Sequence, residues 1–427
     1  MQDKSYIQFT KEMKKDYTIL VPNMLPIHFK LIASVMKTYG YNMEILENSG
    51  NEVIEAGLKY THNDTCYPAI LVIGQFMDAL MSGKYDLNKT ALIMFQTGGG
   101  CRASNYISLI RKALKNAGLE HIPVISLSLA GLEKHSGFDI NLKVILSMLY
   151  GVFYGDLLMS LVNQIRPYEK VKGDAELLAS KWTEKLGAEL GSEGKIKYRK
   201  IKENCREIVK SFSEISVTKR DAVKVGIVGE IFVKYSPLAN NDLENLLISE
   251  GAEPIVPGLW DFCLYCIYNM IAEYGVYKNK NLTYLIIKAI YKLLCKKKND
   301  ISDIIRENSR FRPWTPFEKI TEIAHDVISN SVKMGEGWLL TAEMLELAEM
   351  GCENIVCTQP FGCLPNHICG KGMMKPLKEK NPDINIVAID YDAGASNVNQ
   401  ENRIKLMLFN ARKIADKKTA KEFTVHN

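Results

Sequence analysis

The chain has 427 residues, of which 47% are hydrophobic and 24% charged, and its formal net charge is +5. This composition is that of an ordinary globular protein of two or three domains, and it excludes a disordered or low-complexity chain. The strongest basic run, CKKKND at 295–300, is short, and the other basic residues are interspersed with acidic ones. We therefore expect no nucleic-acid partner.

The first 17 residues contain no apolar core of the kind that a signal peptide needs, and no stretch of about 18 uncharged apolar residues occurs. We therefore expect a cytoplasmic protein with no membrane partner. In a reducing cytoplasm, the ten cysteines are expected to act as metal ligands or redox groups rather than to form structural disulfides.

The N-terminal part of the chain alternates between short apolar strands and helices. Residues 17–24 (YTILVPNM) predict a buried strand, 27–40 a helix and 41–46 a second strand. The alternation recurs in three further segments, 89–96, 104–118 and 122–129. Residues 141–165 predict a long, mostly apolar helix. Strand–helix–strand is the repeating unit of a parallel α/β sheet, so we predict a first α/β domain over 1–165.

The remainder of the chain predicts a charged helical linker at 166–220 and a second α/β region at 221–427. That region begins with the strand pattern AVKVGIVGEIF and contains a helical insertion at 260–347. It ends as strand, cysteine loop, helix, strand and helix, at 354–361, 361–370, 370–382, 384–392 and 399–415. The predicted fold class is α/β, with two or three parallel-sheet domains and helical insertions. Ligands bind such sheets at the carboxyl ends of the strands.

Three cysteines are predicted to lie in loops that leave strand ends. Cys66 occurs in THNDTCYPA, Cys101 in QTGGGCRASNY and Cys363 in QPFGCLPNH. Each has a proline or glycine neighbour and precedes a segment that can begin a helix, whose dipole lowers the pKa of a nearby thiol. Iron and zinc require thiolate, so these residues are candidate metal ligands. Because they are far apart in the sequence, only the fold can bring them together.

Other interpretations of the same residues remain open. The close pair Cys263 and Cys266 lies in an apolar helical pattern that a core position also explains. A nucleophilic cysteine would need a histidine, and His62 and His367 each lie four residues from a candidate cysteine. Cys205 and Cys295 lie in charged helical stretches without any sign of chemistry.

Two polar motifs near these cysteines have equally open interpretations. The glycine run TGGGCRASN lacks the Lys-Ser/Thr of a Walker motif, so it is a weak phosphate-loop signal, and its glycines would let the backbone approach a ligand closely. Asp390 and Asp392 are either turn residues or site residues at a strand end.

Several long motifs together resemble a known family. NDTCYP, TGGGCRASNY, VGIVGEIFVKYSP, QPFGCLPNH and NIVAIDYDAGASNVNQENRIKLML are similar to the acyl-CoA dehydratase activase-related proteins. These belong to the 2-hydroxyacyl-CoA dehydratase and benzoyl-CoA reductase superfamily, which includes double-cubane-cluster proteins. The resemblance covers about 17–412. It implies flavodoxin-like domains with an oxygen-sensitive iron–sulfur cluster between them, and a separate ATP-hydrolysing iron–sulfur activase that supplies electrons at low potential.

The resemblance also implies which residues hold the cluster. Carried over to this chain, the ligands of a 4Fe–4S cluster are Cys66, Cys101 and Cys363. A double-cubane cluster would need more thiols, of which Cys357 is the first candidate. Behind it come three groups of spare thiols, at Cys263 and Cys266, at Cys352 and at Cys369. Neighbours expected around the cluster are Thr65, Tyr67, Gly99, Gly100, Arg102, Phe361, Gly362 and Asn366.

Two functions follow from the resemblance. The chain is either a reductase-like or dehydratase-like enzyme that acts on a small molecule or an acyl-CoA, or a non-catalytic electron-transfer or maturation protein. Loops that converge at strand ends usually frame a pocket, which favours the enzyme. Glu230, at another strand end, is a further candidate for the same pocket. No Walker motif or actin-like phosphate loop is recognisable, so an ATP-hydrolysing partner is expected, and a homodimer is one expected assembly.

Overall fold

The computed structural model describes residues 6–62, 64–95, 101–127, 135–138, 140–192, 197–277, 281–308 and 310–425. The chain divides into two compact units, each described by itself below. Unit 1 comprises 1–155 and 180–196, and unit 2 comprises 156–179 and 197–427. The first domain was expected to end at residue 165. The boundary between the units instead falls inside helix α6 (Leu142–Ile165), and most of α7 (Asp174–Gly191) belongs to unit 1.

Unit 1 is built on a four-stranded parallel sheet in the order β2-β1-β3-β4. Its strands are β1 (Thr18–Val21), β2 (Asn42–Ile45), β3 (Thr90–Phe95) and β4 (Val124–Leu127). The centres of β1, β3 and β4 are buried apolar residues, as expected for parallel strands covered on both faces. The helices of this part are α1 (Met13–Asp16), α2 (Pro26–Thr38), α3 (Asn51–Tyr60), α4 (Tyr67–Met81) and α5 (Tyr106–Asn116), with 3-10 turns η1 (Leu87–Lys89) and η2 (Arg102–Asn105).

Helices α3 and α4 approach each other closely because glycines face each other across their contact. A Cβ on Gly74 would lie 2.0 Å from the Val53 carbonyl oxygen, and one on Gly57 would lie 2.2 Å from that of Ile70. Helix α4 is buried over almost its whole length. The start of α4, where Cys66 lies, is therefore fixed by backbone packing rather than by a flexible surface contact.

Unit 2 repeats the same topology with a second four-stranded parallel sheet, in the order β6-β5-β7-β8. Its strands are β5 (Val223–Gly229), β6 (Ala252–Ile255), β7 (Asn354–Pro360) and β8 (Asn385–Tyr391). In both sheets the first strand lies between the second and the third, which is the flavodoxin-like arrangement. The predicted α/β class with parallel sheets is thus confirmed.

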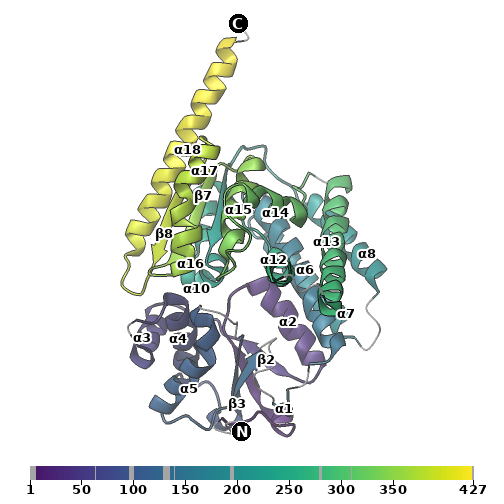
Figure 1. Cartoon of the computed structure of the whole chain (residues 1–427), viewed down its shortest axis with the longest axis vertical. Helices are drawn as coiled ribbons and strands as arrows, with labels where there is room; N and C mark the ends of the chain where they lie inside the picture. Colours follow the sequence, from purple (N-terminus) through teal and green to yellow (C-terminus); the bar gives the residue numbers. More distant parts are fainter. Residues whose placement is uncertain are drawn as a thin grey trace. The chain divides into compact units, whose positions relative to one another are not determined.

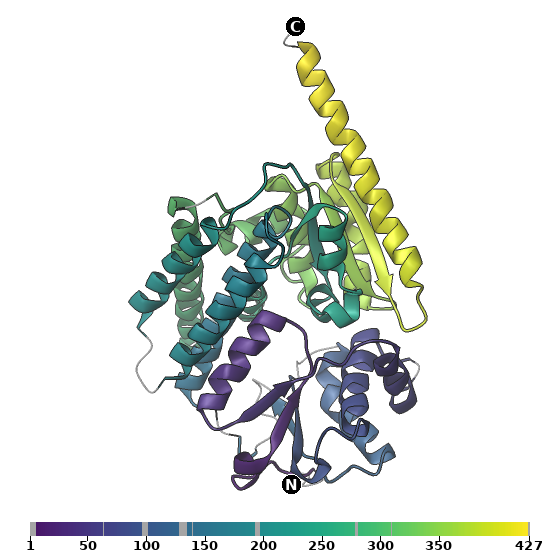
Figure 2. The same cartoon turned by 180° about the vertical axis from the view of Figure 1, so that it is seen from behind.

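The helices of unit 2 include a large insertion between β6 and β7, where 260–347 was predicted to be helical (Figure 1). The insertion holds α12 (Leu259–Val276), α13 (Leu282–Asn308), α14 (Phe317–His325) and α15 (Gly337–Glu349). The other helices are α8 (Tyr198–Ser213), α9 (Ile231–Tyr235), α10 (Pro237–Asn240), α11 (Leu243–Ser249), α16 (Leu364–Cys369), α17 (Met374–Lys380) and α18 (Asn397–Val425), with the 3-10 turn η3 (Lys371–Met373). Figures 1 and 2 show α18 beside β8, with its far end extending past the sheet.

One helix in the described residues, α6, is long and apolar enough to cross a membrane by length and composition. In its most apolar window, 72% of the residues are buried inside the protein, as in the core helix of a folded domain. Asp156 and Asn163, in its C-terminal half, are buried and point to partners in unit 2. We therefore treat α6 as a core helix.

Candidate functional site

The three predicted ligand cysteines share one local geometry. Each is the N-cap residue of the helix that follows it, namely α4 for Cys66, η2 for Cys101 and α16 for Cys363. All three have an extended backbone, with φ of −63°, −79° and −73° respectively, and all three are partly exposed. An N-cap side chain lies beside the unpaired N–H groups of the first turn, which favour a thiolate, while burial of Cys363 acts in the opposite direction and raises the pKa of its thiol.

In unit 1, the starts of the helices that follow Cys66 and Cys101 lie side by side. The Sγ atom of Cys66 is 3.9 Å from the hydroxyl of Tyr106, the first residue of α5. Cys101 begins the 3-10 turn that leads directly into α5. The contact with Tyr106 therefore places Cys66 beside the start of α5, five positions after Cys101 in the sequence.

The prediction that Cys66 leaves a strand end is wrong, because it lies between α3 and α4. Only Cys101 and Cys363 follow strands, β3 and β7. The sequence places a turn at NDTCYP correctly but gives no sign that a helix, rather than a strand, precedes it. Cys66 meets the start of α5 through the packing of α4 against α5, which is a tertiary contact.

The expected neighbours in unit 1 occupy different environments. Tyr67 begins α4 and is 4% exposed, whereas Arg102 in η2 is exposed. The backbone N–H of Thr65 donates to the carbonyl of His62, which closes the turn before Cys66. Gly99 and Gly100 lie outside the described residues, so their placement near a cluster stays a prediction.

In unit 2, Cys363 follows β7 through a turn that requires glycine at Gly362, whose φ is +72°. Phe361 points outward and is 67% exposed, while its N–H donates to the carbonyl of Tyr391. Asn366 is fully buried in the first turn of α16. Its Nδ2 atom lies 3.5 Å from the Cys363 sulfur and 2.9 Å from Oε2 of Glu336, to which it donates.

Two carboxylates lie near this thiol, Glu230 at the end of β5 and Glu336 at the start of α15. Glu230 caps α9 by accepting the Val233 N–H at 2.8 Å. Glu336 accepts the Ile231 N–H at 3.0 Å, in addition to the Asn366 amide. Burial raises the pKa of Glu230 to about 8, and the nearby charge of Glu336 raises it further in the same direction. Burial likewise raises the pKa of Glu336. Two such neighbours are not both ionised at neutral pH, so the pair holds a proton there.

Sequence reasoning missed Glu336, which lies 106 positions from Glu230. It stands between Gly335 and Gly337, both with positive φ. A Cβ on Gly337 would lie 2.2 Å from the Val332 carbonyl oxygen. The pattern Gly-Glu-Gly before an apolar helix is a signal that could have marked a constrained carboxylate.

The other cysteines of unit 2 that were named as further candidate ligands differ in how deeply they are buried. Cys357 is fully buried in the middle of β7, where a Cβ on Gly370 would lie 3.0 Å from its sulfur. Cys352 and Cys369 are also buried, and Cys263 is partly buried. Cys266, one turn after Cys263 on α12, is exposed as a residue, and its pKa is raised mainly by burial of the thiol and further by the charge of Glu336. Cys266 therefore lies near the Cys363 site, while the packing of Cys357 is that of a core residue. Both assignments to iron stay predictions.

The histidines do not form a cysteine–histidine pair in the described structure. The Nδ1 atom of His367 lies 2.9 Å from the carbonyl oxygen of Cys363, and its ring therefore faces the backbone rather than the sulfur. His62 is exposed and lies 3.4 Å from Asp64. Asp390 accepts hydrogen bonds from Gln359 at 2.6 Å and Lys371 at 3.1 Å, and Asp392 is exposed. These contacts make Asp390 part of a polar network next to the β7 turn.

The residues of unit 2 fit a thiolate-bound centre, although no metal-binding group of three or more His, Cys, Asp or Glu is found within the described ranges. The buried Asn366 amide can donate to a thiolate, as donors around iron–sulfur ligands do. Its Oδ1 atom is buried without a hydrogen-bond partner among those same residues. Burial raises the pKa of the Cys363 thiol to about 12, and a bound cation would act in the opposite direction by favouring the thiolate.

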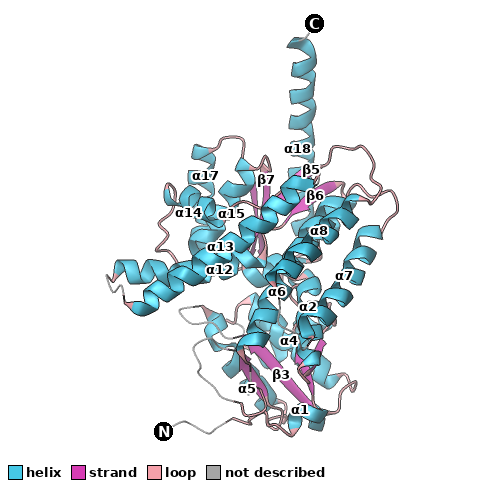
Figure 3. Cartoon of the chain, turned by 90° about the vertical axis from the view of Figure 1, so that its right-hand side faces the viewer, coloured by secondary structure: helices cyan, strands magenta, loops and turns pink. Residues whose placement is uncertain are grey.

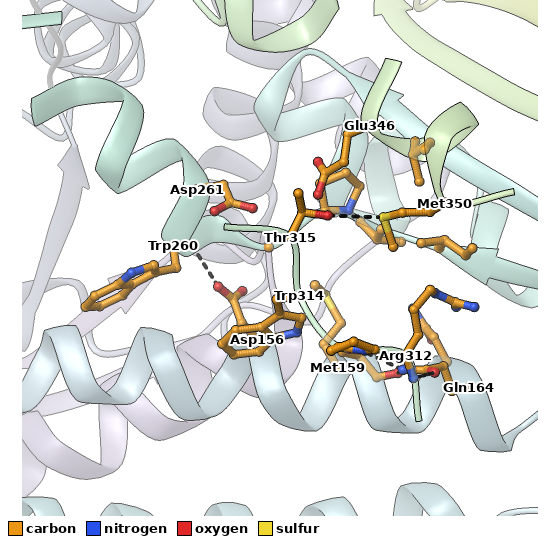
Figure 4. A pocket seen from close by; sticks show the side chains of 18 of the residues that line it. Asp156, Met159, Gln164, Trp260, Asp261, Arg312, Trp314, Thr315, Glu346 and Met350 are labelled. Atoms are coloured by element: carbon orange, nitrogen blue, oxygen red, sulfur yellow. Dashed lines mark hydrogen bonds between the residues drawn. The ribbon is translucent and has the colours of Figure 1, made fainter. Parts of the chain in front are cut away.

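A pocket with polar and charged lining lies at the carboxyl end of β6, between α6, α12 and α15 (Figure 4). Asp156 accepts the N–H groups of Leu259 and Trp260 at 2.8 and 2.7 Å, and so caps α12. Lys298 lies 2.5 Å from Asp261 in a buried ion pair. These contacts join α6 and α13 to the N-terminal end of α12.

Buried charges extend from this pocket along α15. Burial raises the pKa of Glu346 to about 7. Nearby, Glu343 forms a buried ion pair with Lys234 of α9, with the nitrogen 2.9 Å from the carboxylate oxygen. Sequence analysis had assigned no role to this charged interior.

Comparison of the sequence with protein-family models finds no match, and a search of the curated proteins finds no significant similarity. The family membership inferred from the motifs therefore stays a prediction.

Proposed function

We propose that this chain is an oxygen-sensitive iron–sulfur protein in which Cys66, Cys101 and Cys363 hold the cluster. The observation that carries the proposal is the shared N-cap geometry of these three thiols. Cys66 and the helix after Cys101 are in contact in unit 1, and Cys363 has a buried amide donor beside it in unit 2. Three thiolates would leave one iron of a 4Fe–4S cluster open for a substrate.

We further propose that the protein is a reductase-like or dehydratase-like enzyme acting on a small molecule or an acyl-CoA. When bound, the cluster would supply single electrons at low potential. Reduction of an organic substrate also consumes protons, and the Glu230–Glu336 pair holds one close to Cys363. Asn366 links the pair to the thiol by donating to Glu336 while facing the sulfur. Such a proton store has no use in a simple electron carrier, which favours the enzyme.

One observation favours the alternative, an electron-transfer or maturation protein. Cys266 is exposed and lies near Glu336, so it could serve as a further thiolate ligand in unit 2. Four thiolates on one cubane would close the coordination of every iron and leave no position for a substrate. Counting the cysteines needed for full iron content therefore separates the two functions.

The experiment is anaerobic purification followed by iron and sulfide analysis and electron paramagnetic resonance of the reduced protein. Cys66→Ser, Cys101→Ser and Cys363→Ser should each lose most of the iron, because a hydroxyl is a poor ligand where a thiolate is required. Cys205→Ala, a buried thiol on α8, is the matched control and should keep it. Full iron retention in all three serine variants would refute the cluster assignment. Cys266→Ser tests the alternative, because iron loss there would indicate a fourth ligand.

The electron source is proposed to be a separate ATP-hydrolysing iron–sulfur protein, since the chain has no recognisable Walker motif. Mixing the purified protein with reduced ferredoxin, and following the cluster spectrum, tests this part. Complete reduction without ATP would refute it. Reduction only when the ATP-hydrolysing protein and ATP are both added would support it.

A further inference from the structure

Helices α12 and α13 pack against each other and carry several exposed apolar residues, and Figure 3 shows the two helices lying side by side. Each of these side chains is between 46% and 74% exposed. We call the set the hairpin face, and its members are Met270, Tyr277, Leu282, Leu285, Ile286, Ile290 and Leu293. Isolated exposed apolar residues are normal, but a group of this size marks an interaction surface.

The spacing on α13 shows that the face is one stripe and not a scatter. Leu282, Ile286 and Leu293 are separated by four and seven positions, which places them on the same side of a helix. Leu285 and Ile290 flank this line on either side. The opposite side of α13 packs against α8 and α12. The stripe is therefore the part of an otherwise packed helix that no described residue covers.

The charged residues of α13 beside the stripe are basic up to Asn299, while the exposed Glu273 on the α12 side forms an ion pair with Lys333. From Tyr274 to Asn299 the sequence contains seven lysines and no aspartate or glutamate. Lys288, Lys292 and Lys296 are exposed, and none of them forms an ion pair with the residues that the structure describes. Three lysines without an ion-pair partner among the described residues, one of them (Lys288) over the ring of Tyr284, thus border an apolar stripe, which is the arrangement of helices that lie in the interface of anionic membranes.

We propose that the hairpin face binds the surface of a membrane containing anionic phospholipids, with α13 lying flat. In that orientation the Leu and Ile side chains enter the acyl boundary and the lysines reach the phosphates. Insertion of the hairpin end first is disfavoured, because Lys278 and Lys280 lie in the sequence that joins the helices. A second copy of the chain is a poor occupant, because its lysines would oppose these lysines. The expectation of no membrane partner considered only spanning segments, which a surface contact does not need.

The test is co-sedimentation of the full chain with vesicles of phosphatidylcholine alone, or of phosphatidylcholine with phosphatidylglycerol. The chain is expected to bind the vesicles that contain phosphatidylglycerol at least about tenfold more strongly than those of phosphatidylcholine alone, and this binding should weaken as the salt concentration rises. The double variants Leu285→Ser/Ile290→Ser and Lys288→Glu/Lys292→Glu should each lose the binding to anionic vesicles. Matched controls on other exposed positions, Leu177→Ser and Lys170→Glu/Lys172→Glu, should bind like the unchanged protein.

Three outcomes would overturn the proposal. The first is no binding to the anionic vesicles, which would leave an acidic protein as the occupant of the face. The second is binding that survives both double variants. The third is self-association of the unchanged chain, seen by sedimentation velocity and abolished by Leu285→Ser/Ile290→Ser. None of these measurements depends on the cluster, so the result is separate from the test of the proposed function.

Discussion

Replacing Glu230 by glutamine tests whether the strand-end carboxylate pair holds a proton. Glutamine keeps an oxygen that can accept the Val233 N–H, so the α9 cap is preserved while the titration is removed. Burial raises the pKa of Glu230 from 4.5 to about 8, with a further contribution from Glu336. A carboxyl group whose pKa is raised by folding stabilises the protein below its unfolded pKa, and this stability is lost as the pH rises through the folded pKa.

The magnitude follows from the size of the shift. At 1.36 kcal/mol for each pKa unit, the native state loses on the order of 5 kcal/mol between pH 4.5 and 8, relative to a chain without this group. Because the pair titrates together, we take this value as an upper bound. Glu230→Gln should therefore unfold with a free energy similar to that of the unchanged protein near pH 5 and with a clearly higher one near pH 8.5.

The assay is denaturant unfolding of the cluster-free chain at several pH values, followed by tryptophan fluorescence. Three of the four tryptophans, Trp260, Trp314 and Trp338, are in unit 2, so the signal reports mainly on the unit that contains Glu230. Glu379→Gln removes an exposed carboxylate of the same unit and serves as the control. A stability difference between Glu230→Gln and the unchanged protein that stays constant from pH 5 to 8.5 would refute the proton-holding pair.

Further predictions concern packing and charge in unit 2. Gly337→Ala should lower the free energy of unfolding by about 2 kcal/mol or more, because its Cβ would lie 2.2 Å from the Val332 carbonyl oxygen at a φ of +48°. Gly275 is a helical glycine with open space around it, so Gly275→Ala should be neutral or stabilising by up to about 1 kcal/mol. Equal losses of stability in the two variants would contradict the geometry. Lys234→Met should cost about 3–5 kcal/mol at neutral pH by leaving Glu343 buried without its cation. Adding Glu343→Leu should recover most of that loss, and a double variant as unstable as the single one would show that the ion pair is not the cause. Asn366→Ala should lower the reduction potential of the bound cluster, because it removes the hydrogen-bond donor beside the Cys363 sulfur. An unchanged potential in a redox titration would argue against Cys363 as a ligand.

The sequence by itself determined the class of fold and most of the strands, although it did not indicate the helix α3 before Cys66. Strands such as TILV, TALIMF and NIVCTQP are short apolar runs bounded by turn residues, and local periodicity is enough to identify them. The Pro, Gly and Cys pattern around Cys363 likewise placed a turn before a helix, since these preferences act between near neighbours. The α/β class and the helical insertion followed from such local signals.

Only the tertiary structure decided which distant residues meet. Cys66 follows a helix rather than a strand, and it meets Tyr106 of α5 through the packing of α4 against α5. Glu336 joins Glu230 because α15 starts beside the end of β5, a contact between segments 106 positions apart. The exposed stripe on α13 could be recognised only once its opposite face was seen to be packed. Local patterns cannot specify these contacts, because they depend on how buried surfaces of separate elements fit together.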